Sequence, residues 1–421
     1  MRLVEKLECT QADLAENRLG RWRDVMSFRS CARWDRPRMD DMWDVAIVGA
    51  GPAGSAAALR AAQLRPELRV LLLDRADFPR DKPCGDGIAA HGRDELARLG
   101  LPTLIDDYRP TPRLTVVSPG GVRVSAEAAR PNHVVPRRVF DARLVAAAQA
   151  RGVEVRRHRV KDLVFDGSGV VIDGRLRART VVAADGAGSV VRRLIGLAAA
   201  AEKHTAIAVR GYADVPEEDD VQLIAMQKAG WPAYAWSFPI GDGTANVGFG
   251  MLLPRLRAAG APGRQVLHGR LAELLPDRPA RELRAHHLPL STGRPTPGAG
   301  RVLLAGDAAG LINPLTGEGI YYALLSGRLA AEAAVESPGD PLALYRAKLR
   351  GALGRHLRTT DVLARLAQHP GFIDAAIETA VRRKEVFDLL VEVGLGNGTV
   401  PAPLALAVGT RWLRGSLRAG R

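Results

Sequence analysis

The chain has 421 residues, of which 47% are hydrophobic and 25% charged, and this composition excludes a disordered or fibrous protein. Its net charge of +14 rests mainly on arginines spread along the chain, so compositional bias explains it better than a nucleic-acid site does. Three cysteines without a CxxC pair or a Cys/His cluster favour a reducing, cytoplasmic location and predict no metal site. No run of about 18 apolar residues occurs, so neither a membrane span nor an export signal is expected.

Residues 1–42 mix both charge signs without apolar periodicity, and we interpret them as a poorly ordered extension outside the fold. A start site assigned too far upstream is the alternative, because Met39 and Met42 stand directly before the first strand. Residues 43–74 then read strand, glycine-rich turn, alanine-rich helix and strand. This order predicts one βαβ unit.

The middle of the chain predicts a helix over 137–150, followed by short strands around 153–155, 163–165, 170–172 and 181–184. Alternating, aromatic-bearing strands between 204 and 290 predict a separate antiparallel sheet. The strand 301–305 returns to the α/β pattern, and the chain after Gly317 is expected to be mostly helical.

The C-terminal tail, 401–421, interrupts apolar residues with basic ones. Its apolar members are Leu404, Leu406, Trp412, Leu413 and Leu417, and its basic members are Arg411, Arg414, Arg418 and Arg421. Such a tail is suited to peripheral contact with an anionic membrane, for instance at the inner face of the cell membrane. A solvated helical face is the commoner explanation of such charge.

The first glycine-rich turn is a GxGxxG motif placed between a strand and a helix. Gly49 allows the tight turn, Gly51 lets backbone N–H groups approach a pyrophosphate, and Gly54 permits close packing of the helix on the strand. Asp74, at the end of the next strand, is placed to accept from ribose hydroxyls and favours FAD or NAD over NADP. The predicted nucleotide-binding residues of this unit are Gly49, Gly51, Ala53, Gly54, Asp74 and Arg75.

Two later turns favour FAD over NAD. Asp185 begins an Asp-Gly turn after one strand, and Asp307 follows Gly306 after another. Behind the GxGxxG motif, they resemble the signatures of the FAD-dependent group that includes the aromatic hydroxylases. The resemblance implies that Asp307 bonds the ribityl chain and that Arg137 contacts the flavin. A neighbouring arginine, or an arginine that merely begins a helix, remains an alternative for Arg137.

Three segments narrow this resemblance to the geranylgeranyl reductase family, over roughly 43–345. They are Lys82–Gly87 (KPCGDG), Tyr234–Pro239 (YAWSFP, followed by Asn246-Val247-Gly248) and Gly306–Ile320 (GDAAGLINPLTGEGI). The resemblance implies a flavoenzyme that saturates double bonds in the polyprenyl chains of lipids, chlorophyll precursors or menaquinone. It places the loop of Cys84, Gly85, Asp86 and Gly87 beside the flavin ring.

The same residues have a direct physical interpretation. A helix is predicted after Gly319, and the uncovered backbone N–H groups of Gly319 and Ile320 suit the negative charge of a reduced flavin; a well-capped helix start is the alternative. Tyr234, Trp236 and Phe238 share one face of a strand, which suits a long apolar pocket although most such stripes are core. Cys84 contacts the flavin, shapes the pocket or assists proton delivery, and the sequence does not choose among these roles.

The predicted fold is α/β, with a Rossmann-type FAD-binding domain interleaved with an antiparallel-sheet substrate domain and followed by a helical region. The FAD-binding segments are 43–110, 132–200 and 295–345, the substrate-binding segments are 111–131 and 201–294, and the helical region is 346–421. The predicted function is reduction of carbon–carbon double bonds of a geranylgeranyl or menaquinone-type chain by hydride from reduced FAD. No residue stands out as the proton source, and neither the substrate nor the oligomeric state follows from the sequence.

Several alternatives stay open at this point. The chain has one dinucleotide fingerprint, so NAD(P)H would bind transiently as the reductant, and a ferredoxin-like donor is equally compatible. An FAD-dependent monooxygenase or halogenase of an aromatic or natural-product substrate shares the flavin motifs. The WxWxIP strand of a halogenase differs from YAWSFP, and the lysine motif of halogenases is not evident in this sequence. A non-enzymatic basic protein leaves the flavin motifs unexplained.

Overall fold

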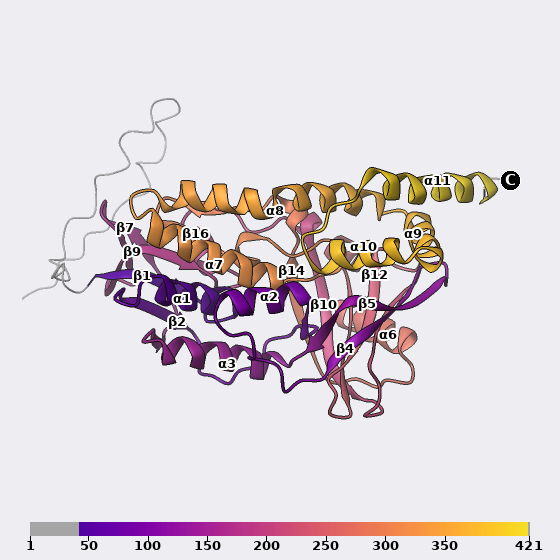
Figure 1. Cartoon of the computed structure of the whole chain (residues 1–421), viewed down its shortest axis with the longest axis horizontal. Helices are drawn as coiled ribbons and strands as arrows, with labels where there is room; N and C mark the ends of the chain where they lie inside the picture. The colour runs from indigo at the N-terminus through magenta and orange to yellow at the C-terminus, as the bar shows by residue number, and fades with distance from the viewer. Residues whose placement is uncertain (1–41, 420–421) are drawn as a thin grey trace, which may run out of the picture.

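The computed structural model describes residues 42–419, which form two eight-stranded sheets with helices on and between them (Figure 1). The predicted N-terminal extension therefore lies outside the described residues, apart from Met42, which is buried before the first strand. In the described part of the chain, no helix is both long and apolar enough to cross a membrane.

The first sheet has a parallel centre in the order β15-β16-β9-β1-β2-β6, with β7 and β8 added beside β9. Its strands are β1 (Trp43–Val48), β2 (Val70–Asp74), β6 (Glu154–Arg157), β7 (Leu163–Phe165), β8 (Val170–Ile172), β9 (Leu176–Ala183), β15 (Gly298–Ala299) and β16 (Val302–Leu304). β1 and β2 are almost wholly buried and apolar, as strands covered on both faces are, and Val45 pairs with Val70 in parallel register. The predicted βαβ unit is confirmed.

The helices packed around this sheet are α1 (Pro52–Leu64), α2 (Ala90–Arg98), α3 (Arg137–Ala150), α4 (Val190–Leu194), α7 (Ile320–Glu336) and the first half of α8 (Pro341–Leu366). α1 and α7 approach so closely that a Cβ atom at Gly327 would lie 2.0 Å from the carbonyl oxygen of Ala53. Small residues along both helices permit this contact, which places the start of α1 against α7 at Gly327.

The second sheet runs β14-β10-β13-β12-β11-β4-β5-β3. Its strands are β3 (Gly87–Ile88), β4 (Pro110–Val117), β5 (Arg123–Val134), β10 (Thr205–Asp214), β11 (Val221–Met226), β12 (Ala233–Pro239), β13 (Thr244–Leu252) and β14 (Arg281–Pro289). The predicted antiparallel pairing is wrong at one place, since β11 and β4 are parallel. Two chain segments enter this sheet separately, and they meet at that pair. Two short helices, α5 (Leu253–Arg257) and α6 (Gly263–Leu274), pack on it.

The C-terminal region is helical, as expected, and continues from α8 through α9 (Pro370–Arg382), α10 (Lys384–Leu395) and α11 (Ala402–Ala419). These helices lie beside the second sheet, and α11 extends at the opposite end of the molecule from β7 (Figure 1). Apolar residues of β4, α9 and α10 form one buried cluster there, with Leu404 and Val408 of α11 packed against it. The division into separate domains stays a prediction.

Candidate functional site

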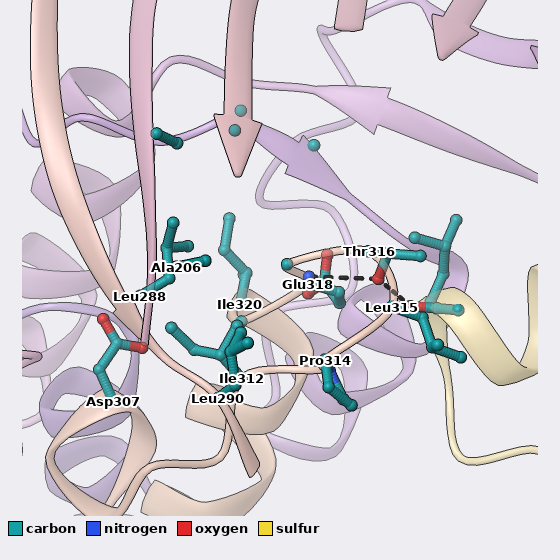
Figure 2. Close-up of a pocket in the computed structure, with 18 of the residues that line it drawn as sticks. Ala206, Leu288, Leu290, Asp307, Ile312, Pro314, Leu315, Thr316, Glu318 and Ile320 are labelled. Atoms are coloured by element: carbon teal, nitrogen blue, oxygen red, sulfur yellow. Dashed lines mark hydrogen bonds between the residues drawn. The ribbon is translucent and has the colours of Figure 1, made fainter. Parts of the chain in front are cut away.

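A cavity of about 1490 Å³ runs from the Gly-rich turn after β1 to the C-terminal helices. Its walls come from both sheets, from the loop at 80–89, from the loop before α7, and from α8 to α11. Figure 2 shows part of this wall, where Leu288, Leu290, Ile312 and Ile320 lie between Asp307 and the turn of Thr316 and Glu318. The cavity therefore reaches both the predicted nucleotide site and the predicted substrate strand.

The Gly-rich end of the cavity carries the features of an anion site. A Cβ atom at Gly51 would lie 3.6 Å from Nη2 of Arg137 and 3.7 Å from Nη2 of Arg80. Two guanidinium groups thus flank the open N-terminus of α1, where a helix dipole and backbone N–H groups also favour negative charge. Arg137 is held by two hydrogen bonds to Asp141, at 2.6 and 2.8 Å, and it lines the cavity.

Asp74, at the end of β2, also lines the cavity. Its carboxylate accepts from the backbone N–H of Ala50 and of Ala76, both at 2.9 Å, and pairs with Arg80 at 3.4 Å. Each carboxylate oxygen has room for more than one hydrogen bond. Asp74 is therefore fixed by the Gly-rich turn that it faces and keeps acceptor capacity toward the cavity.

Asp307 and Asp185 occupy different environments. The carboxylate of Asp307 faces the cavity and pairs with Lys82 Nζ at 3.2 Å. Burial alone would raise its pKa, but Lys82 and His286 hold the pKa of Asp307 below its usual range, so it is charged. The side chain of Asp185 instead accepts from the backbone N–H of Val190 at 2.7 Å and of Val191 at 3.1 Å. It serves the start of α4, and the turn backbone lies at the cavity.

Two polar side chains on the cavity wall have buried atoms without a hydrogen-bond partner among the described residues. Arg210 of β10 is 2% exposed, and its Nε and Nη1 are unpaired, as is Nε2 of His286 on β14. Burial and the nearby Lys82 lower the pKa of His286 to about 4, so its ring is neutral. Unpaired buried donors cost free energy unless a ligand or water satisfies them. This wall, with the glycine cradle and the arginines, fits a large polar cofactor such as FAD.

The N-terminus of α7 begins beside Asp307, because a Cβ atom at Gly319 would lie 3.6 Å from Asp307 Oδ1. Within residues 42–419, no side chain caps the helix at Gly319 itself. Glu318 accepts from the backbone N–H of Tyr321 at 2.8 Å, so an acidic side chain of the protein already lies at the first turn of α7. Burial raises the pKa of Glu318 to about 7, although the N–H groups of Tyr321 and Ile320 oppose the rise.

The structure brings the Cys84 loop against the aromatic strand. A Cβ atom at Gly85 would lie 3.5 Å from the ring of Phe238 and 3.6 Å from Nε1 of Trp236. Farther along the same face of β12, the Tyr234 hydroxyl donates to the carbonyl of Thr316 in the loop before α7. The three segments that carry the resemblance therefore meet at one place, and Cys84 and all three aromatic residues line the cavity there.

Asn246 of β13 joins these parts. Its side-chain oxygen accepts from Trp236 Nε1 at 2.8 Å, and its amide donates to the carbonyl of Cys84 at 2.8 Å and to Asp86 Oδ2 at 2.7 Å. Asp86 also accepts from the Tyr212 hydroxyl at 2.8 Å and is fully buried. Burial raises its pKa to about 6, against the effect of Arg210. Its side chain therefore shapes the loop from behind rather than lining the cavity.

Burial raises the pKa of the Cys84 thiol, and the opposing charge of Arg137 does not reverse this. A thiol with a raised pKa stays protonated at neutral pH, so Cys84 is not a preformed thiolate nucleophile. Burial also raises the pKa of the Tyr234 hydroxyl, with smaller contributions from Glu318 and Cys84. The groups around this point thus tend toward their neutral forms.

Most of the predicted site residues share the one cavity. Those on its wall are Gly49, Gly51, Ala53, Asp74, Arg75, Cys84, Gly85, Gly87, Arg137, Asp185, Tyr234, Trp236, Phe238, Asp307, Gly319 and Ile320. Gly54, Asp86 and Gly306 lie behind the wall: Gly54 packs against the carbonyl of Gly49, and Gly306 donates its N–H to Ser326. Sequence reasoning included Lys82, Asn246 and Glu318 in its motifs without giving them a role. It missed Arg80, Arg210 and His286. A polar residue inside an apolar strand was the available signal for Asn246.

Comparison with known proteins bears on this cavity. The model of the FAD binding domain family matches residues 42–254, about half of the chain. A menaquinone reductase of Mycobacterium tuberculosis (strain ATCC 25618 / H37Rv) is 32% identical over 381 residues, covering 84% of this chain and 91% of the relative. A digeranylgeranylglycerophospholipid reductase of Methanopyrus kandleri is also similar to this chain. The chain therefore belongs to the geranylgeranyl reductase family. It is an FAD-dependent oxidoreductase.

A further relative agrees in sequence, and solved structures share the fold. Digeranylgeranylglycerophospholipid reductase 2 of Methanopyrus kandleri is 34% identical over 316 residues, covering 70% of this chain and 77% of the relative. The crystal structure of a geranylgeranyl bacteriochlorophyll reductase-like protein from Thermoplasma acidophilum superposes with a TM-score of 0.74. It is 21% identical and covers 89% of this chain and 97% of its own. The flavin-dependent brominase Bmp2 shares the fold with a TM-score of 0.61, at 21% identity over 80% of this chain and 92% of that chain.

Proposed function

We propose that this enzyme reduces carbon–carbon double bonds in the polyprenyl chain of a lipid or a menaquinone-type quinone. The observation that carries the proposal is the division of the cavity into two halves. The half near the Gly-rich turn is lined by charged residues such as Asp74, Arg137 and Asp307. Among the described lining residues of α9, α10 and α11, none carries a charge. A long hydrocarbon chain fits such a wall, and an ionic substrate does not.

The two halves meet at Cys84, Tyr234 and Glu318, which supports placing the reaction there. Reduced FAD, when bound, supplies the hydride for one alkene carbon, and a proton must reach the other. An isolated alkene is a poor hydride acceptor, so the protein must exclude water and hold the chain in a reactive position. Trp236 and Phe238 form the wall that we assign to this task.

Two neutral groups at the meeting point hold a proton that they can give up. The thiol of Cys84 has a raised pKa, and the carboxyl of Glu318 keeps its proton up to about pH 7. Asn246 fixes the Cys84 loop, and the N–H of Tyr321 fixes the Glu318 carboxyl. We propose that the proton comes from one of these two residues.

The electron donor is part of the proposal. The Gly-rich turn after β1 is the one dinucleotide fingerprint in the sequence, and FAD accounts for it. We therefore propose that NAD(P)H or a ferredoxin-like protein reduces the flavin without a second Rossmann domain.

We also propose that the enzyme takes its substrate from an anionic membrane through the outer face of α11. Leu406 and Leu413, seven residues apart on that helix, are 70% and 64% exposed. Val362 on α8 and Val381 on α9 are also exposed, near Arg365 and Arg382. Exposed apolar and basic residues on helices that close the cavity support contact with lipid.

A panel of prenyl lipids tests the proposed reaction. FAD-loaded enzyme, reduced with dithionite, is offered a menaquinone, a digeranylgeranyl glycerophospholipid and geranylgeranyl diphosphate, and products are analysed by mass spectrometry. We expect at least one of them to gain two hydrogens per turnover. If none gains hydrogen while the enzyme holds reduced FAD, the proposed function is wrong.

A further inference from the structure

We infer that the inner face of α11, and Trp412 above all, sets how far a prenyl chain extends past the reaction point and thereby which double bond is reduced. This inference rests on the proposed function, because it assigns a role to the far wall of the same cavity. It concerns a segment, 402–412, that lies outside the motifs of the resemblance.

α11 presents two different faces. Leu404, Val408 and Trp412, spaced by four residues, lie on the cavity wall, whereas Leu406 and Leu413 are exposed. Leu404 and Trp412, two of the apolar residues of the tail, are half-buried and line the cavity, while membrane contact of the tail stays a prediction. The side chains of Arg414, Leu417 and Arg418, and Arg421 as a whole, lie outside the described part of the structure.

Contacts between the elements show the order in which the cavity walls follow one another with increasing distance from the Cys84 loop. Thr316 lies in the loop before α7, and its carbonyl accepts from Tyr234. Its hydroxyl donates to the carbonyl of Gly394 at 2.5 Å, so the end of α10 abuts the loop before α7. Phe387 near the start of α10 belongs to the buried cluster that Leu404 and Val408 of α11 pack against. α11 is thus the outer wall of the apolar half, and Figure 1 shows it at that end of the molecule.

The wall at Trp412 is held from several sides. Its ring meets Phe372 edge-on at 5.4 Å and lies 5.8 Å from the ring of His369, while the neighbouring Arg411 pairs with Glu378 of α9 at 2.5 Å. From Leu404 to Trp412 the helix covers about 12 Å of the cavity wall. A large aromatic side chain fixed in this way is a stop or a bend for a flexible hydrocarbon chain.

A prenyl chain that stops against Trp412 places its double bonds at fixed distances from the Cys84 loop. A smaller side chain lets the same substrate slide farther, so that a different double bond stands at the reaction point. Discrimination by one methylene in an apolar pocket is typically about 10- to 200-fold. A change of a whole indole ring is therefore expected to alter chain-length selectivity by at least about tenfold.

The test compares Trp412→Ala with Thr410→Ala, an exposed residue two positions earlier on the same helix that does not line the cavity. Each FAD-loaded variant is reduced and given prenyl chains of increasing length, and mass spectrometry locates the saturated bond. Binding of fully saturated chains of the same lengths, measured by equilibrium titration, gives a readout without turnover. FAD content and melting temperature show that each variant is folded, and Trp412→Phe tests rescue by a smaller aromatic ring.

We expect Trp412→Ala to move the saturated position and to shift the preferred chain length in both turnover and binding, with Trp412→Phe intermediate and Thr410→Ala unchanged. An unchanged product position and an unchanged length preference in Trp412→Ala overturn the inference, while wild-type reduction of prenyl chains still supports the proposed function. Should Trp412→Ala lose FAD or unfold, Trp412→Phe and Val408→Ala take its place, and the same unchanged profile overturns the inference. If wild type reduces no prenyl chain, the proposed function itself fails.

Discussion

Gly248 decides where the indole ring of Trp236 lies. A Cβ atom at Gly248 would lie 2.2 Å from that ring and 2.5 Å from the carbonyl oxygen of Val209, so no other residue fits beneath the ring. Gly250, two positions on, would place a Cβ atom at an ordinary 3.4 Å from Ala208. The two glycines lie on the same strand, and this difference makes them a matched pair.

We expect Gly248→Ala to displace Trp236 from Asn246 and to lower turnover, with FAD retained. Overpacking of this kind typically costs about 1–3 kcal/mol of stability, whereas Gly250→Ala is expected to cost less than about 1 kcal/mol. Chemical denaturation, tryptophan fluorescence and turnover of the two variants test this. Equal effects of the two substitutions on stability and turnover would contradict the conclusion that Gly248 makes room for the indole ring of Trp236.

The raised pKa of Glu318 predicts that the stability of the folded protein depends on pH in a definite direction. Its pKa is raised from 4.5 to about 7 in the folded protein, mainly by burial. The folded state therefore binds a proton that the unfolded state releases between these values, and this stabilising contribution is lost as pH rises toward 7. We expect Glu318→Gln to stabilise the protein relative to wild type by an amount that grows between about pH 4.5 and 7, reaching at most about 3 kcal/mol.

Melting temperatures of wild type and Glu318→Gln, measured without substrate at several pH values, check this. Gln keeps an oxygen that accepts from the N–H of Tyr321, so the start of α7 is preserved. A difference between the two proteins that stays constant from pH 4.5 to 8 would show that the carboxyl titrates at its ordinary pKa.

Single residues of the site differ in how well the sequence predicts them. Gly51 and Asp307 follow from a motif because backbone geometry and a charged group are local properties, and both line the cavity. The role of Asn246, although it belongs to a motif, and that of Arg210 do not follow from the sequence, because their partners lie 160 and 129 residues away in the chain. Asp86 belongs to the motif but faces the protein interior, since the loop turns its side chain toward Tyr212.

At the scale of secondary structure, α11 separates a cavity wall from an outer apolar surface. The tail sequence alone did not distinguish the two faces, because the separation depends on which side packs against α9. The helix 137–150 and the strands 163–165 and 170–172 were predicted to the residue, since local periodicity defines them. The parallel pairing of β11 with β4 was not, because it joins segments about 100 residues apart.

From the exposed apolar residues on the outer face of α11 we predict that the protein binds to anionic vesicles. Replacing Leu406 and Leu413 together by Ser removes two exposed apolar side chains, and each is worth up to about 1.5–3 kcal/mol when buried. We expect sedimentation with phosphatidylserine vesicles to weaken at least about tenfold, and wild-type binding to fall with added salt.

The control replaces Val164 and Phe165 by Ser, because these exposed residues lie in the β7–β8 hairpin at the other end of the molecule. That variant is expected to sediment like wild type. Equal loss in both variants, or no loss in either, would leave α11 as an ordinary solvated helix on its outer side.

For the whole molecule, the two sheets and the C-terminal helices together make one cavity with a charged half and an apolar half. The motifs predict the charged half, because a Gly-rich turn and an aspartate at a strand end act through local geometry. The apolar half comes from α9, α10 and α11, whose sequence shows amphipathic helices without showing what they enclose. The substrate wall therefore becomes visible only in the assembled fold.

The central claim is that hydride transfer saturates the substrate and that oxygen takes no part. The direct test gives dithionite-reduced, FAD-loaded enzyme its prenyl substrate under strict anaerobiosis, with a parallel reaction under ¹⁸O₂. We predict that the flavin is reoxidised and that the product gains two hydrogens and no oxygen in both reactions. A product that forms only when O₂ is admitted and that carries ¹⁸O would contradict the account and establish a monooxygenase.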